Sequence, residues 1–134
     1  MKIDNNLSPI DIAMSGLRAQ NKNMKAVSSN IANIRTTDTG NGEPYRRIEA
    51  KMRATNDGIS CVEVEEIAED MSNFQELLDP GHPDADVNGY VRMPNVNLPM
   101  ELINMNRAKK LYQANVAVMK RYQQMAETTL ELLR

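Results

Sequence analysis

His82 is the only histidine in the chain and Cys61 the only cysteine, so these two side chains are the first candidates for chemistry. A hydrolytic zinc site normally takes three protein ligands, mostly His or Cys, and this chain offers only two. His82 precedes Pro83 in a stretch rich in proline and aspartate, which favours a histidine hydrogen-bonded within a turn over a metal ligand or proton shuttle. Cys61 has no adjacent helix start or base to activate its thiol, which is typical of a small strand hydrophobe rather than a nucleophile.

The segment 84–89 matches the opening half of a calcium-binding loop, in which acidic and amide side chains alternate before a glycine. Such a loop needs a bidentate glutamate at its twelfth position, and here that position is Asn95. Prolines just upstream also interrupt the helix that should enter the loop. The pattern therefore predicts an Asp- and Asn-rich turn closed by Gly89 with a positive φ, and it leaves weak calcium binding at Asp84–Asn88 as the alternative.

No other grouping of residues matches a catalytic or ligand-binding site. Gly40 and Gly42 lack the preceding strand and following helix of a phosphate-binding loop. Ser28 and Ser29 have no partner histidine on the same helix. The chain has no tryptophan and one phenylalanine, so a large aromatic-walled pocket is hard to build. We predict no catalytic, cofactor-binding or metal-binding residues, and a protein that is not an enzyme.

The net charge of −2 conceals a segregation, because both ends of the chain carry a small positive excess and residues 41–97 carry a negative one. Nucleic-acid binding requires a concentrated basic face, so nucleic acid is not a predicted partner. The segregation favours contacts between the middle of one copy and the ends of another. Residues 1–9 lack the apolar core of a secretory signal, and no stretch reaches the roughly 20 apolar residues of a membrane span. Neither a cleaved signal peptide nor a direct membrane span is predicted.

Two long amphipathic helices are predicted, over residues 8–35 and 98–134. The first begins at Ser8–Pro9, where a hydroxyl caps the first turn and proline suits the first helical position. In both helices apolar side chains recur at alternating steps of three and four, which is typical of a coiled-coil seam and requires a partner helix. The seam positions are Ile10, Ala13, Leu17, Met24, Val27, Ile31 and Ile34, then Leu98, Leu102, Met105, Tyr112, Val116, Met119, Ala126, Leu130 and Leu133, with Gln20, Lys109 and Gln123 as polar exceptions.

Residues 36–97 form the predicted β and loop insert. Residues 47–54 alternate charged and apolar side chains, which indicates a half-buried strand. Thr55–Gly58 is a hairpin turn signal, followed by a second strand over Ile59–Ile67, and residues 79–90 are a rigid, turn-rich stretch. The predicted fold is mainly α with a small β insert, in a single domain over residues 1–134. The terminal helices pair like a coiled coil and the insert lies at their far end.

Three motifs, in this order, resemble the axial proteins of the bacterial flagellum, the family of rod, hook and hook-associated subunits. The first helix ends in the sequence S-S-N-I-A-N, residues 28–33, followed by a threonine-rich turn and Tyr45. Residues 79–97, which begin D-P-G-H-P-D-A-D-V-N-G-Y-V, and the preceding G-E-P-Y-R-R at 42–47 resemble a short proximal-rod member of the family. The third motif is Y-Q-A-N-V at 112–116, where Lys109 stands in place of the usual small residue three positions before the tyrosine.

The resemblance implies a structural subunit of the proximal rod, part of the drive shaft that transmits torque for motility. It also implies self-association, contacts with other flagellar rod subunits and with the hook–basal-body adaptor protein, and passage through the flagellar type III export apparatus. The chain would then lie in the periplasmic rod of the basal body without a cleaved signal peptide. Its terminal helices would become ordered on assembly.

Within that role, seam side chains are predicted to carry the packing, and amides to fix the register through inter-subunit hydrogen bonds. The turn-rich stretch would set the tilt of the subunit against its neighbours. The predicted assembly interface comprises Leu17, Met24, Val27, Asn30, Ile31, Asn33, Tyr45, Tyr112, Gln113, Asn115, Val116 and Met119. The predicted structural turn comprises Asp79, Pro80, His82, Pro83, Asp84, Gly89, Tyr90, Pro94 and Asn95.

A small binding module is the alternative from another functional class, either a calcium-dependent adaptor or an export chaperone with a helical groove. Saturable calcium binding would favour the adaptor, and a folded, soluble dimer would favour the chaperone. A rod subunit should instead co-assemble with other rod subunits.

Overall fold

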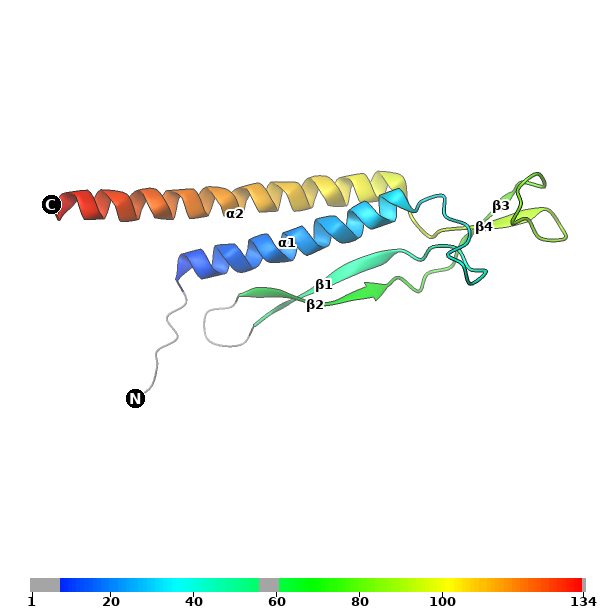
Figure 1. Cartoon of the computed structure of the whole chain (residues 1–134), viewed down its shortest axis with the longest axis horizontal. Helices are drawn as coiled ribbons and strands as arrows, with labels where there is room; N and C mark the ends of the chain where they lie inside the picture. The colour runs from blue at the N-terminus through cyan, green and yellow to red at the C-terminus, as the bar shows by residue number, and fades with distance from the viewer. Residues whose placement is uncertain (1–7, 56–60, 134) are drawn as a thin grey trace.

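The structure, a computed structural model, describes residues 8–55 and 61–133 and is elongated, with its two helices side by side along its length (Figure 1). The elements follow in the order α1 (Pro9–Ala32), β1 (Ile48–Ala54), β2 (Val62–Glu69), β3 (Gln75–Leu78), β4 (Tyr90–Met93) and α2 (Leu98–Leu132). The prediction of two long terminal helices with a small β region between them is confirmed. Neither described helix is long and apolar enough to cross a membrane.

Local sequence explains where both helices begin. The Asp11 carboxylate accepts hydrogen bonds from the backbone N–H and the hydroxyl of Ser8, at 3.0 and 2.9 Å, and Pro9 has no N–H to satisfy. The Asn97 side chain caps α2 by accepting a backbone N–H at 3.1 Å. α1 has 24 residues, and the 35 residues of α2 span roughly 50 Å. The helices run antiparallel, and α2 continues past the start of α1 (Figure 1).

Two separate antiparallel hairpins form the insert, because β1 pairs with β2 and β3 pairs with β4. β1 lies where the alternation of charged and apolar residues placed it. β2 continues to Glu69, beyond the predicted end at Ile67. β3 and β4 are short and were not predicted as strands. Of the turn predicted at Thr55–Gly58, residues 56–58 lie outside the described residues.

The β1–β2 hairpin runs back alongside α1, and the expectation that the whole insert lies at the far end of the helices is wrong (Figure 1). Two polar side chains of α1 hold the hairpin there. Asn30 bonds both backbone groups of Ile48, at 2.9 Å to the nitrogen and 2.8 Å to the oxygen, and the Ser15 hydroxyl accepts from the Val62 N–H at 3.1 Å. The β3–β4 hairpin and its turn lie beyond the helix pair, together with the loop that follows α1 (Figure 1).

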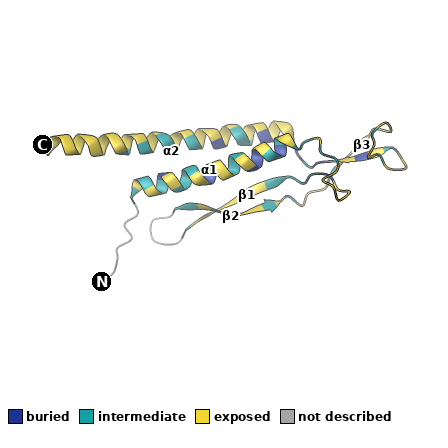
Figure 2. Cartoon of the chain, viewed as in Figure 1, coloured by how far each residue is buried: buried dark blue, intermediate teal, exposed yellow. Residues whose placement is uncertain are grey.

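The core is thin and consists mainly of small side chains. Buried positions gather where the helix pair meets the insert, while most of α2 is exposed (Figure 2). Leu102 and Lys109, two predicted seam positions of α2, are exposed, whereas their neighbours Glu101 and Ala108 are buried. The helices therefore pair, but a coiled-coil seam at the predicted positions is not confirmed. The buried hydrophobic residues are Ala13, Ala19, Ala26, Val27, Val91, Val96 and Ala108.

Candidate assembly surfaces

A buried asparagine joins α1, β1 and α2. Asn30 has 0% of its surface exposed, and its amide nitrogen donates to the Ile48 carbonyl at 2.8 Å and to the Glu101 carboxylate at 3.1 Å. Its amide oxygen accepts from the Ile48 N–H at 2.9 Å and from the Tyr45 hydroxyl at 3.1 Å. These four bonds use the hydrogen-bonding capacity of the side chain. In place of the predicted inter-subunit hydrogen bonds, Asn30 makes internal ones, because β1 presents its backbone to α1.

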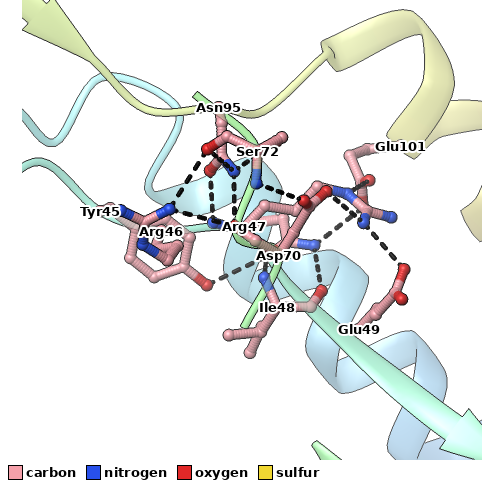
Figure 3. A network of polar contacts seen from close by, with 10 residues as sticks. Tyr45, Arg46, Arg47, Ile48, Glu49, Asp70, Ser72, Asn95 and Glu101 are labelled. Atoms are coloured by element: carbon pink, nitrogen blue, oxygen red, sulfur yellow. Dashed lines mark hydrogen bonds and ion pairs between the residues drawn. The ribbon is translucent and has the colours of Figure 1, made fainter. Parts of the chain in front are cut away.

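Next to Asn30, Arg47 and Glu101 form an ion pair that is largely shielded from water (Figure 3). Arg47 Nε donates to Glu101 Oε1 at 2.8 Å, and Nη1 donates to Glu49 at 3.0 Å and to Asp70 at 3.2 Å. Burial opposes the charge on Arg47, but the hydrogen bonds to Glu101 and Glu49 outweigh it, and the pKa of the guanidinium is raised. Neither Arg47 nor Glu101 was predicted to form this pair, since a glutamate in the first turn of a helix is ordinarily explained by the helix dipole.

Asn95 closes this junction from the side of the β4–α2 connection (Figure 3). The Arg47 N–H donates to Asn95 Oδ1 at 2.8 Å, and Asn95 Nδ2 donates to the Asp70 carbonyl and the Ser72 hydroxyl, each at 2.9 Å. Hydrogen bonds from the backbone and side chain of Ser72, and then from Arg47, lower the pKa of Asp70. Asn95 thus joins the start of β1 to the segment after β2, besides lying near the predicted turn.

The helices approach each other closely at Gly16. A Cβ atom at this position would lie 2.7 Å from Asn115 Nδ2, so no larger side chain fits without movement. Ala108, midway along α2 between Asn115 and Glu101, is 1% exposed. Small residues therefore set this line of contact. This is why the buried face of α2 differs from the stripe predicted from large apolar side chains.

The predicted interface residues are distributed over the inside and the outside of this helix pair. Asn33 donates to the Ser29 carbonyl at 2.9 Å and accepts from the Thr36 hydroxyl at 3.1 Å, so its amide also serves the chain itself. Gln113 is exposed and is the predicted amide best placed to reach a neighbour. Val27 is buried, and the half-buried positions are Leu17, Met24, Ile31, Asn33, Tyr45, Tyr112, Asn115, Val116 and Met119.

The predicted structural turn is built by its own side chains. Asp86 Oδ1 accepts two backbone N–H groups further along the turn, each at 2.8 Å, and Gly89 closes it with φ at 82°. Pro80 packs so closely that a Cβ on Gly89 would lie 3.0 Å from its Cγ. His82 Nδ1 accepts from the Asp84 N–H at 3.1 Å. In the described part of the chain, no three His, Cys, Asp or Glu side chains gather as metal ligands. Of the other predicted turn residues, Pro94 is buried, Asn95 is half-buried, and Asp79, Pro83 and Tyr90 are exposed.

From Leu111 to its C-terminal end, α2 carries large apolar side chains that face solvent. Leu111, Val118, Met125 and Leu132, here called the heptad face, recur at every seventh position and are 44%, 47%, 61% and 83% exposed. Every residue from 123 to 133 is exposed. An apolar heptad that faces water on a single subunit is typical of a helix surface that another chain covers. The predicted seam lies on a neighbouring face of α2, and its last two positions, Leu130 and Leu133, are exposed as well. The heptad face was not predicted, although its residues recur at every seventh position of the sequence.

Two family models match the segments that contain the helices. A model described as flagella basal body rod protein matches residues 10–38, and a model described as flagellar basal body rod FlgEFG protein C-terminal matches residues 87–132. These segments hold nearly all of α1 and α2, including Asn30, Glu101 and the heptad face.

Three relatives, each named flagellar basal-body rod protein FlgC, align with nearly the whole chain. The protein of Agrobacterium fabrum is 40% identical over 127 residues, which cover 92% of this chain and 91% of that relative. The protein of Salmonella typhimurium is 36% identical over 129 residues, with 94% and 96% covered. The protein of Bacillus subtilis is 34% identical over 142 residues, with 92% and 95% covered.

Proposed function

The chain belongs to the family of the flagellar basal-body rod protein FlgC, and on that premise we propose that the heptad face of α2 is where it joins its neighbours in the rod. As a member of this family it is a structural subunit of the flagellar basal body and assembles with other rod components to form the drive shaft. It is not an enzyme. This function takes the place of the two alternatives drawn from the sequence, the calcium-dependent adaptor and the export chaperone.

The exposure of the heptad face is the observation that carries the proposal. Covering a large apolar side chain contributes on the order of 1–3 kcal/mol, and each subunit offers four such side chains on one line of α2. In a helical shaft this contribution is repeated at every subunit. Heterologous contacts that do not close into a ring produce open helical assemblies of this kind. Torque is then shared among many apolar contacts and requires no chemistry.

The predicted seam residues have a second role in this proposal. Leu17, Met24 and Ile31 of α1 are half-buried and keep part of their surface for a neighbouring helix. Gln113 supplies an inter-subunit amide hydrogen bond that fixes the register of an otherwise apolar contact. The turn at residues 79–90 sets the tilt of the subunit. The whole chain, 1–134, acts as one rod-subunit domain.

Location and further partners complete the proposal. The chain passes through the flagellar type III export apparatus without a cleaved signal peptide and takes its place in the periplasmic part of the rod. Its neighbours are further copies of itself, other rod subunits and the hook–basal-body adaptor protein. The three motifs shared with flagellar axial proteins support these partners.

A complementation experiment tests the heptad face. A strain lacking this gene receives the chain with Met125→Glu and Leu132→Glu, which place two charges on the face. We expect secretion of the variant to continue, but no hooks and no swimming. Gln124→Glu, which adds a charge to the same stretch outside the heptad, is the matched control and should swim. Swimming by the double variant at the control's rate would contradict the proposal.

A further inference from the structure

A groove of about 670 Å³ lies between the first half of α1 and β2. Its apolar lining includes Met14 from the helix and Val62 and Val64 from the strand, and Cys61 lies just before the strand. The lining combines apolar and charged side chains, and no described part of the chain fills the groove.

One side of this groove is basic. Arg18, Lys22 and Lys25 line it and are exposed, and their spacing of four and three residues places them on one face of α1. None of the three forms an ion pair within the described ranges 8–55 and 61–133. Asp11 and Glu63 line the groove as well, and they bond to Ser8 and Arg53 respectively. The three cations therefore outnumber the two carboxylates of the lining.

The turn between β3 and β4, here called the tip, has the complementary chemistry. Val87 is 101% exposed, so the turn holds an apolar side chain entirely in solvent. Asp84 and Asp86 precede it closely and are exposed, as is Glu76 on β3. The three carboxylates line a hollow that they share with Thr37 and Arg92, and the Asp84 carboxylate accepts from the Thr37 hydroxyl at 2.7 Å. The Asp86 bonds and the Gly89–Pro80 contact make the tip rigid, so its insertion elsewhere would cost little ordering entropy.

We propose that the tip of one copy inserts into the basic groove of the next copy. Val87 would meet the apolar lining, and the carboxylates beside it would face the cations of α1, which gives both attraction and register. The tip lies beyond one end of the helix pair and the groove lies toward the other end, so the tip cannot reach the groove of the same chain (Figure 1). The contact is therefore head-to-tail and propagates from copy to copy. The inference rests on the proposed rod function, which brings copies of the chain side by side.

Cys61 offers a direct test, because the only native cysteine lines the groove. Cells whose sole copy is the full chain with Val87→Cys are treated with copper–phenanthroline, and their isolated basal bodies are separated without reductant. We expect dimers and longer ladders of this chain. The ladder should disappear when Cys61→Ser is added, since the bond joins position 87 of one copy to position 61 of the next.

Two results would overturn the inference. A ladder that survives Cys61→Ser would show that tips meet each other, and a cross-link to a different rod protein would show that another partner fills the groove. No cross-link in cells that swim normally would also overturn it while leaving the rod function intact. Loss of swimming by the Met125→Glu, Leu132→Glu variant bears on the rod function alone, so the two failures are distinguishable.

Reversing charges in the groove and at the tip provides a second measurement, in which the reporter cysteine stands at position 88 and Val87 is kept. In chains with Asn88→Cys as the reporter, we expect Lys22→Glu to lower the cross-linking yield about tenfold, because like charges then face each other. Asp84→Lys alone should do the same, and the two together should restore the yield. An undiminished yield in both single variants would contradict the charge pairing.

Discussion

The two ends of α2 have opposite surroundings. At its start, the Glu101 side chain is 1% exposed and bonded to Arg47, the residue before β1, and to Asn30 of α1. At its end, Met125 and Leu132 are 61% and 83% exposed. A polar side chain is thus buried at one end, and apolar side chains face water at the other. Apolar side chains are exposed at the start as well, since Met100, Leu102 and Ile103 are 54%, 54% and 63% exposed, but the start is also held by buried bonds to Arg47 and Asn30. We propose that another subunit covers the second end. The comparison separates residues that hold the subunit together from residues that hold the rod together.

Glu101→Ala is expected to give the largest loss of subunit stability. It removes the acceptor of Arg47 Nε and one of the two acceptors of the Asn30 amide nitrogen, and breaking a buried ion pair in this way costs about 3 kcal/mol. Urea unfolding of the purified chain measures the change. Glu63→Ala, which removes an exposed ion pair with Arg53, is the matched control and should cost less than about 1 kcal/mol. Equal losses in the two variants would contradict the importance of the junction.

Gly16→Val is expected to have the next largest effect. Any Cβ at this position presses on Asn115, and overpacking of this kind costs about 2 kcal/mol. Adding Asn115→Ala makes room for the new side chain and should recover part of the loss. The test is a double-mutant cycle by urea unfolding, in which the two changes should couple by more than about 0.5 kcal/mol. Strictly additive losses would show that the helices do not meet at this pair.

These helices also show how much of the structure can be predicted from the sequence alone. Where they begin was predictable, because the Ser8–Asp11 and Asn97 caps are local signals, and the alternating spacing is periodic, but α1 ends at Ala32 and not at the predicted residue 35. The contact line was not predictable, since it depends on Gly16 and Ala108, which no count of large apolar residues selects. The family motif identified Asn30 and Tyr45 without their role, because β1 supplies their partners only in three dimensions. β3 and β4 have four residues each, too short for an alternation to stand out.

Acid should weaken the junction more than the heptad face. Hydrogen bonds from Ser72 and Arg47 lower the pKa of Asp70 in the folded chain. The ionised carboxylate therefore stabilises the fold fully at pH values above the pKa of Asp70 in the unfolded chain, which is about 4. This stabilisation is lost as the pH falls through the lower pKa of the folded chain. In Asp70→Asn this contribution is absent. The free energy of unfolding should therefore fall less steeply below pH 4 in the variant than in the native chain. Parallel pH profiles would argue against this role.

Met125→Glu with Leu132→Glu is expected to have the smallest effect on the isolated subunit. Because both side chains are exposed there, the free energy of unfolding should change by less than about 0.5 kcal/mol. The same variant is expected to abolish rod assembly. A loss comparable with that of Gly16→Val would mean that the heptad face packs inside the subunit, and the contrast between the two ends of α2 would fail.

Amide hydrogen exchange tests this contrast most directly, measured on the isolated full chain and on the same chain in purified basal bodies. Contacts with α1 and β1 should protect residues 98–112 in both samples. Residues 123–132, a helical segment without packing in the isolated chain, should exchange quickly there and become protected on assembly. Equal protection of residues 123–132 in the two samples would contradict the conclusion that this end of α2 is completed by a neighbouring subunit.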